Sequence, residues 1–315
     1  MFFDPLFIFS IIGMSACLAI WMKGIIKKED QSSFILVNIS SIATVLGLLM
    51  LVSIFINAGD LGIILLIASV IAFIVMLIGY LLKSNEILVS SRGYFIPIFL
   101  IFVLRTFLYE PYQIPSGSMM PGLKVGDFLL VNKSSYGTKV NRIGVPFAFN
   151  NDPKYGDVVV FIPPHNPVPY VKRLIGMPGD KVRIINKQIF INSVAIKRDF
   201  YKTEEATITK RYRDSSGQIT IREKEVIIDL FYEEHGETKY VIRNIRGENS
   251  QYPSEWEIPP GHYFVMGDNR DNSNDSTKDV GFVPRENFFG KADYLFMTWE
   301  CWTCLPSFSR TGKIK

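Results

Sequence analysis

Long apolar runs fill the first third of this 315-residue chain, and the remainder has none of comparable length. A helix needs about 20 apolar residues to cross a hydrocarbon core of about 30 Å. Two central runs reach that length without a charge, whereas the first contains Asp4 and the last contains Pro97 and Arg105. The four runs span about Phe2–Met22, Phe34–Ile56, Leu61–Leu82 and Tyr94–Tyr109. The sequence therefore predicts a membrane region over residues 1–109 with about four transmembrane helices.

Basic residues in the connecting loops predict the orientation of this region. They are Lys23, Lys27 and Lys28 after the first run, and Lys83 and Arg92 before the fourth. The loop between the second and third runs has no Lys or Arg. Because cytoplasmic loops carry the excess of positive charge, we expect both chain ends outside the cytoplasm. The first run lacks a basic leading segment and a small-x-small cleavage site, so it predicts an anchor, not a removed signal peptide.

Charge and cysteine content exclude some functions. The net charge of +4 is small and dispersed, which argues against nucleic-acid binding. Cys301 and Cys304 form a Cys-Trp-Thr-Cys segment on the predicted external side, where thiols can be oxidised. A redox role would require a thioredoxin-like βαβ context, which the tail does not show. A small structural disulfide is favoured, with two free thiols as the alternative.

From residue 110 onward the pattern changes to short strands between turn residues. The predicted strands are Asp127–Val131, Asp157–Ile162, Tyr170–Ile175, Lys181–Ile185, Gln188–Asn192, Val226–Phe231, Tyr240–Arg243, His262–Met266 and Asp293–Trp299. Residues 194–256 are dense in charged side chains and poor in large apolar ones. We therefore predict a mainly-β domain built from residues 110–193 and 257–315, with an inserted β subdomain over residues 194–256.

Three separated segments of this outer part carry residues with catalytic potential. They are Pro-Ser-Gly-Ser-Met-Met-Pro at 115–121, Tyr-Val-Lys-Arg-Leu-Ile-Gly-Met-Pro-Gly-Asp at 170–180, and Gly-Asp-Asn-Arg-Asp-Asn-Ser-Asn-Asp-Ser at 267–276. In this order they resemble the type I signal peptidases, bacterial membrane serine proteases with a Ser/Lys dyad. The resemblance covers roughly residues 94–315. It implies a partly barrel-like antiparallel catalytic domain and no cofactor.

The chemistry of Ser118 and Lys172 fits that resemblance. A serine hydroxyl needs a base to remove its proton before it can attack. Lys172 lies in the middle of an apolar strand-like run, on one face with Tyr170 and Leu174. Burial there would favour the neutral amine. Lowering its pKa from about 10.4 to about 8 corresponds to about 3 kcal/mol. We expect no acidic partner for Lys172, because a carboxylate would keep the amine charged.

Without the resemblance, Ser118 and Lys172 could also have purely structural roles. The Ser118 segment could be a polar turn after a membrane span, and Lys172 could lie on an edge strand with its amine in water. Calcium binding at the acidic segment is rejected, because Ser276 and Phe282 stand where a loop starting at Asp271 needs Gly and Glu. We predict no metal site. A Ser-His-Asp triad has no motif around any histidine to support it; the histidines are His165, His235 and His262.

The resemblance assigns further roles. The oxyanion hole would comprise the Ser118 N–H and the Ser116 hydroxyl, and Ser273 would orient the lysine amine. The residues that would brace the site from outside are Asp268, Arg270, Asp275 and Arg173. Relatives often place an Arg directly after the last serine of the third segment, whereas this chain has Thr277. We therefore expect Lys278 or Arg173 to pair with Asp275.

The predicted function is removal of N-terminal signal peptides from exported preproteins by a multi-pass protein of the bacterial inner membrane, with its catalytic domain on the periplasmic or external side. Expected partners are signal peptides with small residues before the cleavage site, the lipid bilayer and the export machinery. About eight residues separate the last run from Ser118, which would hold the site near the bilayer. The alternatives are a catalytically silent membrane scaffold that binds exported chains, and a Ser/Lys protease with another membrane substrate.

Overall fold

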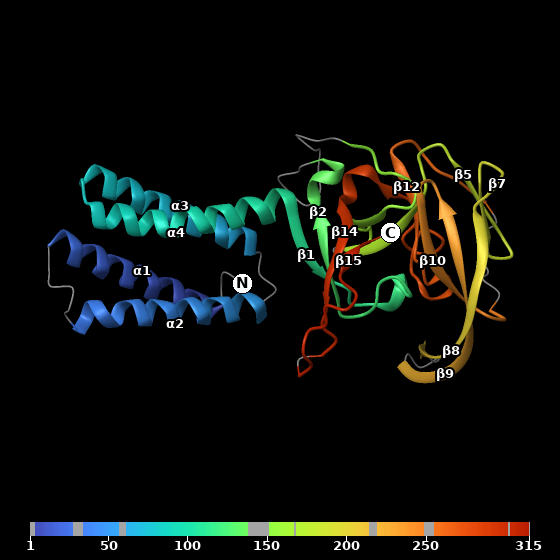
Figure 1. Cartoon of the computed structure of the whole chain (residues 1–315), viewed down its shortest axis with the longest axis horizontal. Helices are drawn as coiled ribbons and strands as arrows, with labels where there is room; N and C mark the ends of the chain where they lie inside the picture. The colour runs from blue at the N-terminus through green and yellow to red at the C-terminus, as the bar shows by residue number, and fades with distance from the viewer. Residues whose placement is uncertain are drawn as a thin grey trace. The chain divides into compact units, whose positions relative to one another are not determined.

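The chain forms two compact units, Met1–Thr106 and Phe107–Lys315, in a computed structural model (Figure 1). The structure describes residues 4–27, 34–56, 61–137, 151–166, 168–213, 219–248, 255–301 and 303–314. The first unit is helical and the second is mainly β, so the predicted fold class is confirmed. The sequence pattern that distinguishes them is the change from long apolar runs to short strand-length runs.

The described part of the first unit contains four apolar helices. They are α1 (Pro5–Ile26), α2 (Phe34–Ile56), α3 (Leu61–Leu81) and α4 (Asn85–Val103). Among the described residues, three segments are long and apolar enough to cross a membrane, namely Pro5–Ile26, Ile64–Leu81 and Asn85–Leu108. The described apolar stretch of α2 is shorter, Ser41–Met50. Asp4 does not interrupt α1 but caps it, because its carboxylate accepts the Phe7 N–H at 3.2 Å.

The fourth helix differs from the sequence prediction. It begins at Asn85, whereas the apolar run suggested a start near Tyr94. Arg92 therefore lies inside α4 and not in a loop, which leaves Lys83 as the basic residue of the α3–α4 turn. The polar residues at the start of α4 are compatible with a helix, since the Ser91 hydroxyl donates to the Ile87 carbonyl at 2.6 Å within the same turn. A short π-helix, Leu104–Leu108, continues α4.

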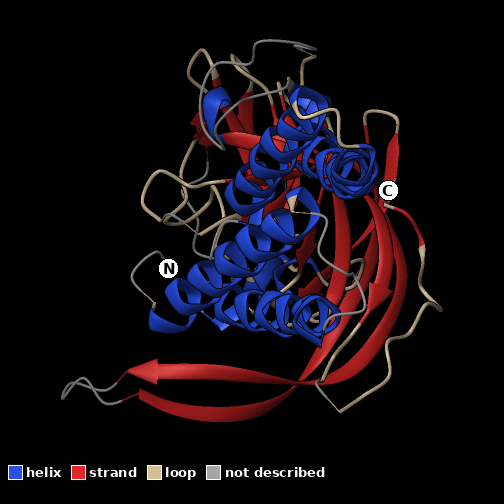
Figure 2. Ribbon diagram, turned by 90° about the vertical axis from the view of Figure 1, so that its left-hand side faces the viewer, coloured by secondary structure: helices blue, strands red, loops and turns tan. Residues whose placement is uncertain are grey.

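A curled antiparallel sheet forms the centre of the second unit (Figure 2). Its order is β1-β2-β14-β3-β4-β12-β13, and β15 also pairs with β14. The strands are β1 (Tyr109–Gln113), β2 (Asp127–Asn132), β3 (Val158–Phe161), β4 (Tyr170–Gly176), β12 (His262–Met266), β13 (Val283–Pro284), β14 (Phe288–Thr298) and β15 (Gly312–Lys313). Register shifts in the long strand β14 let it pair with β2 at one part and β3 at another. The β3 strand is buried along its whole length, so β3 and its neighbours hold the core.

The remaining strands form two smaller sheets. One has the order β11-β5-β6-β7, with β5 (Lys181–Ile185), β6 (Gln188–Ile191), β7 (Val194–Ala195) and β11 (Glu255–Glu257). The other has the order β10-β9-β8, with β8 (Lys197–Arg213), β9 (Ile219–His235) and β10 (Thr238–Ile245). The strands β8 and β9 form the long ribbon seen in Figure 2.

Each of the nine predicted strands overlaps an observed one, but β1, β8 and the short strands β7, β11, β13 and β15 were not predicted. The β8 strand is dense in charged residues, a composition typical of a solvated surface, yet an apolar cluster lies along the ribbon. That cluster comprises Ile208, Val226, Ile228, Leu230 and Ile245. Cross-strand pairing with β9, not continuous hydrophobicity, therefore stabilises β8. The boundaries of the inserted subdomain at residues 194 and 256 stay a prediction.

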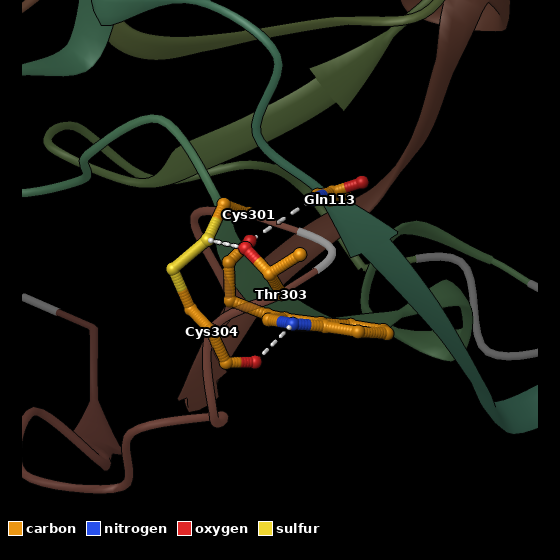
Figure 3. Close-up of a disulfide and its surroundings, with 5 residues drawn as sticks. Gln113, Cys301, Thr303 and Cys304 are labelled. Carbon is orange, nitrogen blue, oxygen red and sulfur yellow. Dashed lines mark hydrogen bonds between the residues drawn. A yellow bond between two sulfur atoms is a disulfide. The ribbon is translucent and has the colours of Figure 1, made fainter.

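A disulfide joins Cys301 and Cys304 just after β14, as the Cys-Trp-Thr-Cys segment predicted (Figure 3). The Trp299 indole N–H donates to the Cys304 carbonyl at 3.0 Å, and the Gln113 amide donates to the Trp299 carbonyl at 3.4 Å. The disulfide-closed turn thus contacts β1. Through β1, the C-terminal segment helps to hold the strand that leads to Ser118.

Candidate active site

The segment that carries Ser118 follows β1 and is held from two sides. On one side, Ile114 exchanges backbone hydrogen bonds with Asp127 and Gly126 at 2.8 and 3.0 Å. On the other, the Asn269 backbone N–H donates to the Ser118 carbonyl at 3.0 Å, and the Asn269 amide donates to the Gly117 carbonyl at 2.8 Å. Because backbone bonds fix both ends, Ser118 is presented on a short 3-10 turn with little freedom to move.

Lys172 lies at the middle of β4, between β3 and β12, and its partner across β3 is Val159. The residue is only 3 % exposed. Its Nζ donates to the Ser118 Oγ at 2.8 Å and to the Val171 carbonyl at 3.0 Å. The alternative of an edge-strand lysine with its amine in water is therefore wrong, since β4 is an inner strand.

Burial lowers the pKa of Lys172 from 10.5 to about 8. The negative charges of Asp275 and Asp268 oppose that shift, but desolvation is the larger effect. Neither carboxylate forms an ion pair with Lys172; within the described residues no Asp or Glu lies within 4.0 Å of its Nζ. A substantial fraction of this amine is therefore neutral near pH 8, which a general base requires.

The hydroxyls expected near the dyad lie close to it. The Ser116 Oγ is 3.4 Å from the Ser118 Oγ, and Ser116 is exposed, so a substrate carbonyl could reach both. Ser273 is 4 % exposed, and its Oγ is buried without a hydrogen-bond partner in the part of the chain that the structure describes. A buried hydroxyl without a partner is unusual and costs about 1–3 kcal/mol. The orienting role of Ser273 stays a prediction, and its unpartnered hydroxyl is compatible with it.

Gly267 sets how closely these groups approach. A Cβ on Gly267 would lie 2.3 Å from the Ser273 Oγ and 2.5 Å from the Ser118 carbonyl oxygen. Both distances are far below van der Waals contact, so only glycine allows the third segment to pack against the nucleophile turn. The sequence contained this glycine, but nothing in the pattern around it indicated the close approach.

Similarity to known proteins decides the family. Residues 88–299 match the family model described as "Signal peptidase, peptidase S26". The chain is 41% identical over 249 residues to a signal peptidase I of Pseudomonas fluorescens, covering 74% of this chain and 82% of that protein. It is 40% identical over 251 residues to a signal peptidase I of Pseudomonas aeruginosa, covering 74% and 81%. A crystal structure of a signal peptidase I from Enterococcus faecalis V583 matches at 24% identity with a TM-score of 0.27, covering 45% of this chain and 97% of that chain.

The chain belongs to the signal peptidase family, peptidase S26. It is therefore a membrane-anchored protease that removes signal peptides from preproteins. This result excludes the catalytically silent scaffold considered from the sequence. It does not by itself say which residues act, so the geometry around Ser118 and Lys172 has to carry that assignment.

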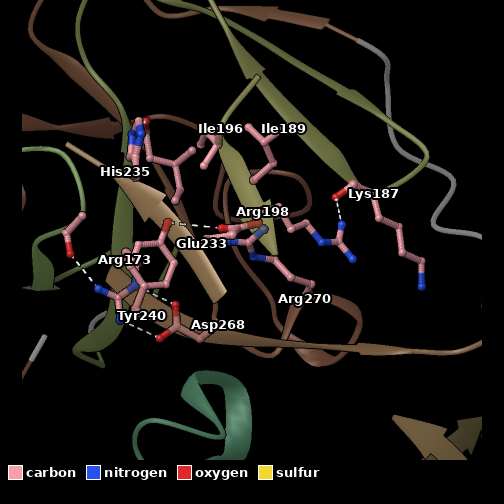
Figure 4. Close-up of polar contacts among 12 residues, drawn as sticks. Arg173, Lys187, Ile189, Ile196, Arg198, Glu233, His235, Tyr240, Asp268 and Arg270 are labelled. Carbon is pink, nitrogen blue, oxygen red and sulfur yellow. Dashed lines mark hydrogen bonds and ion pairs between the residues drawn. The ribbon is translucent and has the colours of Figure 1, made fainter. Parts of the chain in front are cut away.

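Residues next to the candidate dyad of this signal peptidase form a buried polar network (Figure 4). Arg173 donates to Asp268 through Nε and Nη2, both at 2.7 Å, and to the Gly156 carbonyl at 2.7 Å. The Tyr240 ring lies 3.7 Å from the Arg173 guanidinium carbon, and the Tyr240 hydroxyl donates to Glu233 at 3.2 Å. Arg173 and Asp268 therefore bind each other, and Arg173 contacts strand β10.

Arg270 completes this network from the third segment. It forms a bidentate ion pair with Glu233 of β9, in which Nη1 donates to Oε1 at 2.7 Å and Nη2 contacts Oε2. Both side chains are buried. Because a buried carboxylate needs compensating charge, this pair fixes β9 against the loop that follows β12. Sequence reasoning missed Glu233 and Tyr240, since nothing distinguishes them from the other charged and aromatic residues of the insertion.

The prediction that Lys278 or Arg173 pairs with Asp275 was wrong. Arg173 is occupied by Asp268, and the Lys278 amine donates to the Ser273 carbonyl at 2.7 Å. The Asp275 carboxylate instead accepts the Gly267 N–H at 3.0 Å and the Thr277 N–H and hydroxyl at 3.1 and 2.7 Å. Thr277, the departure from the relatives' arginine, thus supplies donors in place of a cation. Two of these bonds are from backbone groups, which a sequence pattern does not reveal.

The histidines lie in other surroundings. The His235 Nε2 is 2.7 Å from the Ile175 carbonyl, and the His262 Nδ1 is 3.0 Å from the Pro260 carbonyl. The His165 and Tyr170 rings meet edge to face, with centroids 6.4 Å apart. None of these three contacts involves Ser118. Among the described residues, no group of three His, Cys, Asp or Glu side chains could hold a metal ion.

Proposed function

We propose that Ser118 is the nucleophile and Lys172 the general base with which this chain cleaves preproteins. The observation that supports this assignment is the 2.8 Å contact between the Lys172 Nζ and the Ser118 Oγ. The lysine amine is buried and forms no ion pair with a carboxylate among the described residues. The serine hydroxyl that it contacts belongs to a half-buried residue. When the amine is neutral, the same contact can reverse, so that the hydroxyl donates its proton to Nζ.

The reaction then follows from these two groups. The Ser118 Oγ attacks the scissile carbonyl while its proton passes to the Lys172 Nζ. The negative oxygen that forms would accept hydrogen bonds from the Ser118 N–H and the Ser116 hydroxyl. Lys172 next gives the proton to the departing amine of the mature protein, and an acyl-enzyme remains. Lys172 then takes a proton from water, which attacks the ester, and passes that proton to the departing Ser118 Oγ as the signal peptide leaves.

The assignment makes Ser273 and the four bracing residues positioning groups. Ser273, with its unpartnered hydroxyl, would hold the lysine amine toward Ser118. Asp268, Arg173 and Arg270 would hold the strands and loops that carry the dyad. Asp275 would fix Gly267 through its backbone N–H.

We further propose a multi-pass protein of the inner membrane whose second unit faces the periplasmic side. Lys23 lies in the last turn of α1, Lys27 caps the C-terminus of that helix, and Lys83 lies between α3 and α4, which fits a cytoplasmic position for these helix ends. Its substrates would carry small residues before the cleavage site, and the lipid bilayer and export machinery would be partners. A cysteine-accessibility assay on a Lys313→Cys variant in intact spheroplasts tests the orientation. Labelling supports an external second unit, and protection contradicts it.

Substitution of the dyad tests the catalytic assignment. The full chain is reconstituted in vesicles with a synthetic preprotein, and Ser118→Ala and Lys172→Ala are compared with Lys181→Ala. Lys181 is an exposed lysine of β5 whose side chain is 58% accessible. Both dyad variants should lose cleavage by at least about a thousandfold, as expected for loss of a catalytic base or nucleophile. Cleavage retained by either variant at the level of Lys181→Ala would overturn the assignment.

A further inference from the structure

A large cavity of the second unit is lined by neither Ser118 nor Lys172. Its volume is about 1490 Å³, which exceeds the roughly 300–1,000 Å³ of a small-molecule site. One wall comes from the inserted strands β8, β9 and β10, and the other from β14, β15 and the turn that follows the nucleophile. Met120 and Pro121 line it, only two and three residues after Ser118. A ligand as large as a peptide segment would fit there.

The lining of this cavity is strongly basic. Nine Lys or Arg side chains contribute to it, against four Asp or Glu. Several of these cations have carboxylate partners, such as Lys202 with Glu204 and Lys291 with Asp157. Lys124, Lys154 and Lys313 form no ion pair with a described carboxylate, and all three are exposed. The cavity is therefore suited to a ligand that brings negative charge.

Arg243 is the unusual member of this lining. It is only 9 % exposed, and its Nε is buried without a hydrogen-bond partner among the residues described. Its Nη1 contacts the Met120 sulfur at 3.6 Å, and a thioether is a weak acceptor. The nearby carboxylate of Glu204 pairs with Lys202. A buried guanidinium without an anion is costly, and its fork of N–H groups suits a carboxylate.

The backbone of Arg243 leads directly to the nucleophile. Its N–H donates to the Asp268 carbonyl at 2.9 Å, and Arg243 forms a parallel bridge with Asn269. Asn269 in turn donates to the Ser118 and Gly117 carbonyls at 3.0 and 2.8 Å. Two hydrogen-bonded steps therefore separate Arg243 from the turn that presents Ser118. Occupation of the cavity at Arg243 would stabilise the position of that turn.

We propose that this cavity, with Arg243 as its anion-binding residue, receives an acidic stretch of the mature part of the preprotein. The inference rests on the proposed function and extends it to the far side of the cleaved bond. The signal peptide itself is unsuited to the cavity, because it is apolar with small residues near the cleavage site. The mature chain is polar, and its first residues leave the active site as the new amine forms. About ten extended residues span roughly 33–36 Å, more than enough to pass from Ser118 beyond Met120.

The test compares two preproteins with the same signal peptide. One carries Asp and Glu within about the first ten mature residues, and the other carries Asn and Gln at the same positions. Wild type, Arg243→Gln and Arg246→Gln are assayed as full chains in detergent micelles without anionic lipid. Arg246 follows β10, pairs with Asp229 on the surface and does not line the cavity, so it is a matched control.

Wild type and Arg246→Gln should cleave the acidic substrate with a kcat/KM about tenfold above that of the neutral one. In Arg243→Gln this ratio should fall close to one, mainly through KM, and added salt of about 1 M should lower the ratio in wild type. A ratio of one in wild type would overturn the inference while cleavage itself continued. An equal loss on both substrates in Arg243→Gln would also overturn it, since Arg243 would then act only in folding.

Assays with and without anionic lipid distinguish binding of a lipid headgroup in the cavity from binding of the mature peptide. If Arg243→Gln loses activity on both substrates only when vesicles contain phosphatidylglycerol, the cavity binds a lipid headgroup and the peptide proposal is wrong. If wild type cleaves neither preprotein, the catalytic assignment fails, and that result is separate from any change in substrate preference.

Discussion

Lys172 and Arg173 are consecutive residues of β4, but within the described chain only Arg173 has a carboxylate partner. The two 2.7 Å bonds from Arg173 to Asp268 compensate the charge of that carboxylate. Asp275 is engaged by the Gly267 N–H and by Thr277. Both acidic groups near Lys172 are therefore occupied by other donors, and desolvation determines the lysine pKa. The neighbour in sequence thus protects the reactivity of the base.

The buried lysine should reduce the stability of the fold at neutral pH. Its pKa is about 8 in the folded chain and 10.5 in the unfolded chain, so the unfolded state binds more protons between these values. The penalty is complete below about pH 8 and disappears as the pH rises toward 10.5. After allowance for lost hydrogen bonds, Lys172→Met should stabilise the chain at pH 7 by about 2 kcal/mol.

Thermal unfolding of full-length Lys172→Met in detergent micelles measures this effect. The melting temperature should exceed that of wild type at pH 7, and the difference should shrink as the pH approaches 10. A variant that is less stable than wild type at pH 7 would contradict the account.

Gly267 should tolerate no side chain. The methyl group of Gly267→Ala would overlap the Ser118 carbonyl at 2.5 Å and the Ser273 Oγ at 2.3 Å. We expect cleavage to fall by at least about a hundredfold, because a displacement of about 1 Å at a reacting group has that effect. Kinetic assay with circular dichroism as a folding control measures it. Gly267→Ala should also lower the melting temperature, and the double variant Gly267→Ala/Ser273→Gly should not restore it, since the clash with the Ser118 carbonyl remains. Full recovery of the melting temperature would show that Ser273 alone is responsible.

Substitution of Glu233 should lower the free energy of unfolding by more than the charged sequence around it suggests. Glu233→Gln leaves Arg270 buried with a neutral partner, and breaking a buried ion pair costs about 3–5 kcal/mol. The adjacent Glu234 pairs with Lys197 and Lys239 at the surface, so Glu234→Gln should cost less than about 1 kcal/mol. Chemical denaturation of both variants compares the two costs. Equal, small losses would mean that the Arg270–Glu233 pair does not hold the insertion to the core.

The sequence predicted those features that depend on local pattern. The alternation in β4 predicted that Lys172 shares one face of an apolar strand with Tyr170 and Leu174, and the apolar runs predicted the helices of the first unit. The start of α4 was missed because Ser90, Ser91 and Arg92 read as a loop, although a helix accommodates them. The β8 strand was missed because its stability comes from pairing with β9 and not from its own composition.

Features that depend on distant contacts could not be predicted. Arg173 and Asp268 are 95 positions apart, and the pairing of Arg270 with Glu233 depends on how β9 packs against the core. The donors to Asp275 are mostly backbone groups, which every residue has. The close approach of Gly267 to Ser118 is visible only once both segments are placed. These contacts depend on where the folded chain brings distant residues together, and residue type alone does not reveal them.

The pH dependence of preprotein cleavage tests the central assignment most directly. The full chain in vesicles is assayed for kcat/KM from about pH 6 to about pH 10, beside Lys172→Met and the surface control Lys181→Met. Wild type and the control should show a rise with a midpoint near 8, the pKa of Lys172, and Lys172→Met should remain at background throughout. A wild-type rate that does not change between about pH 7 and about pH 9, or a Lys172→Met variant that still cleaves with the same profile, would contradict a neutral lysine as the base.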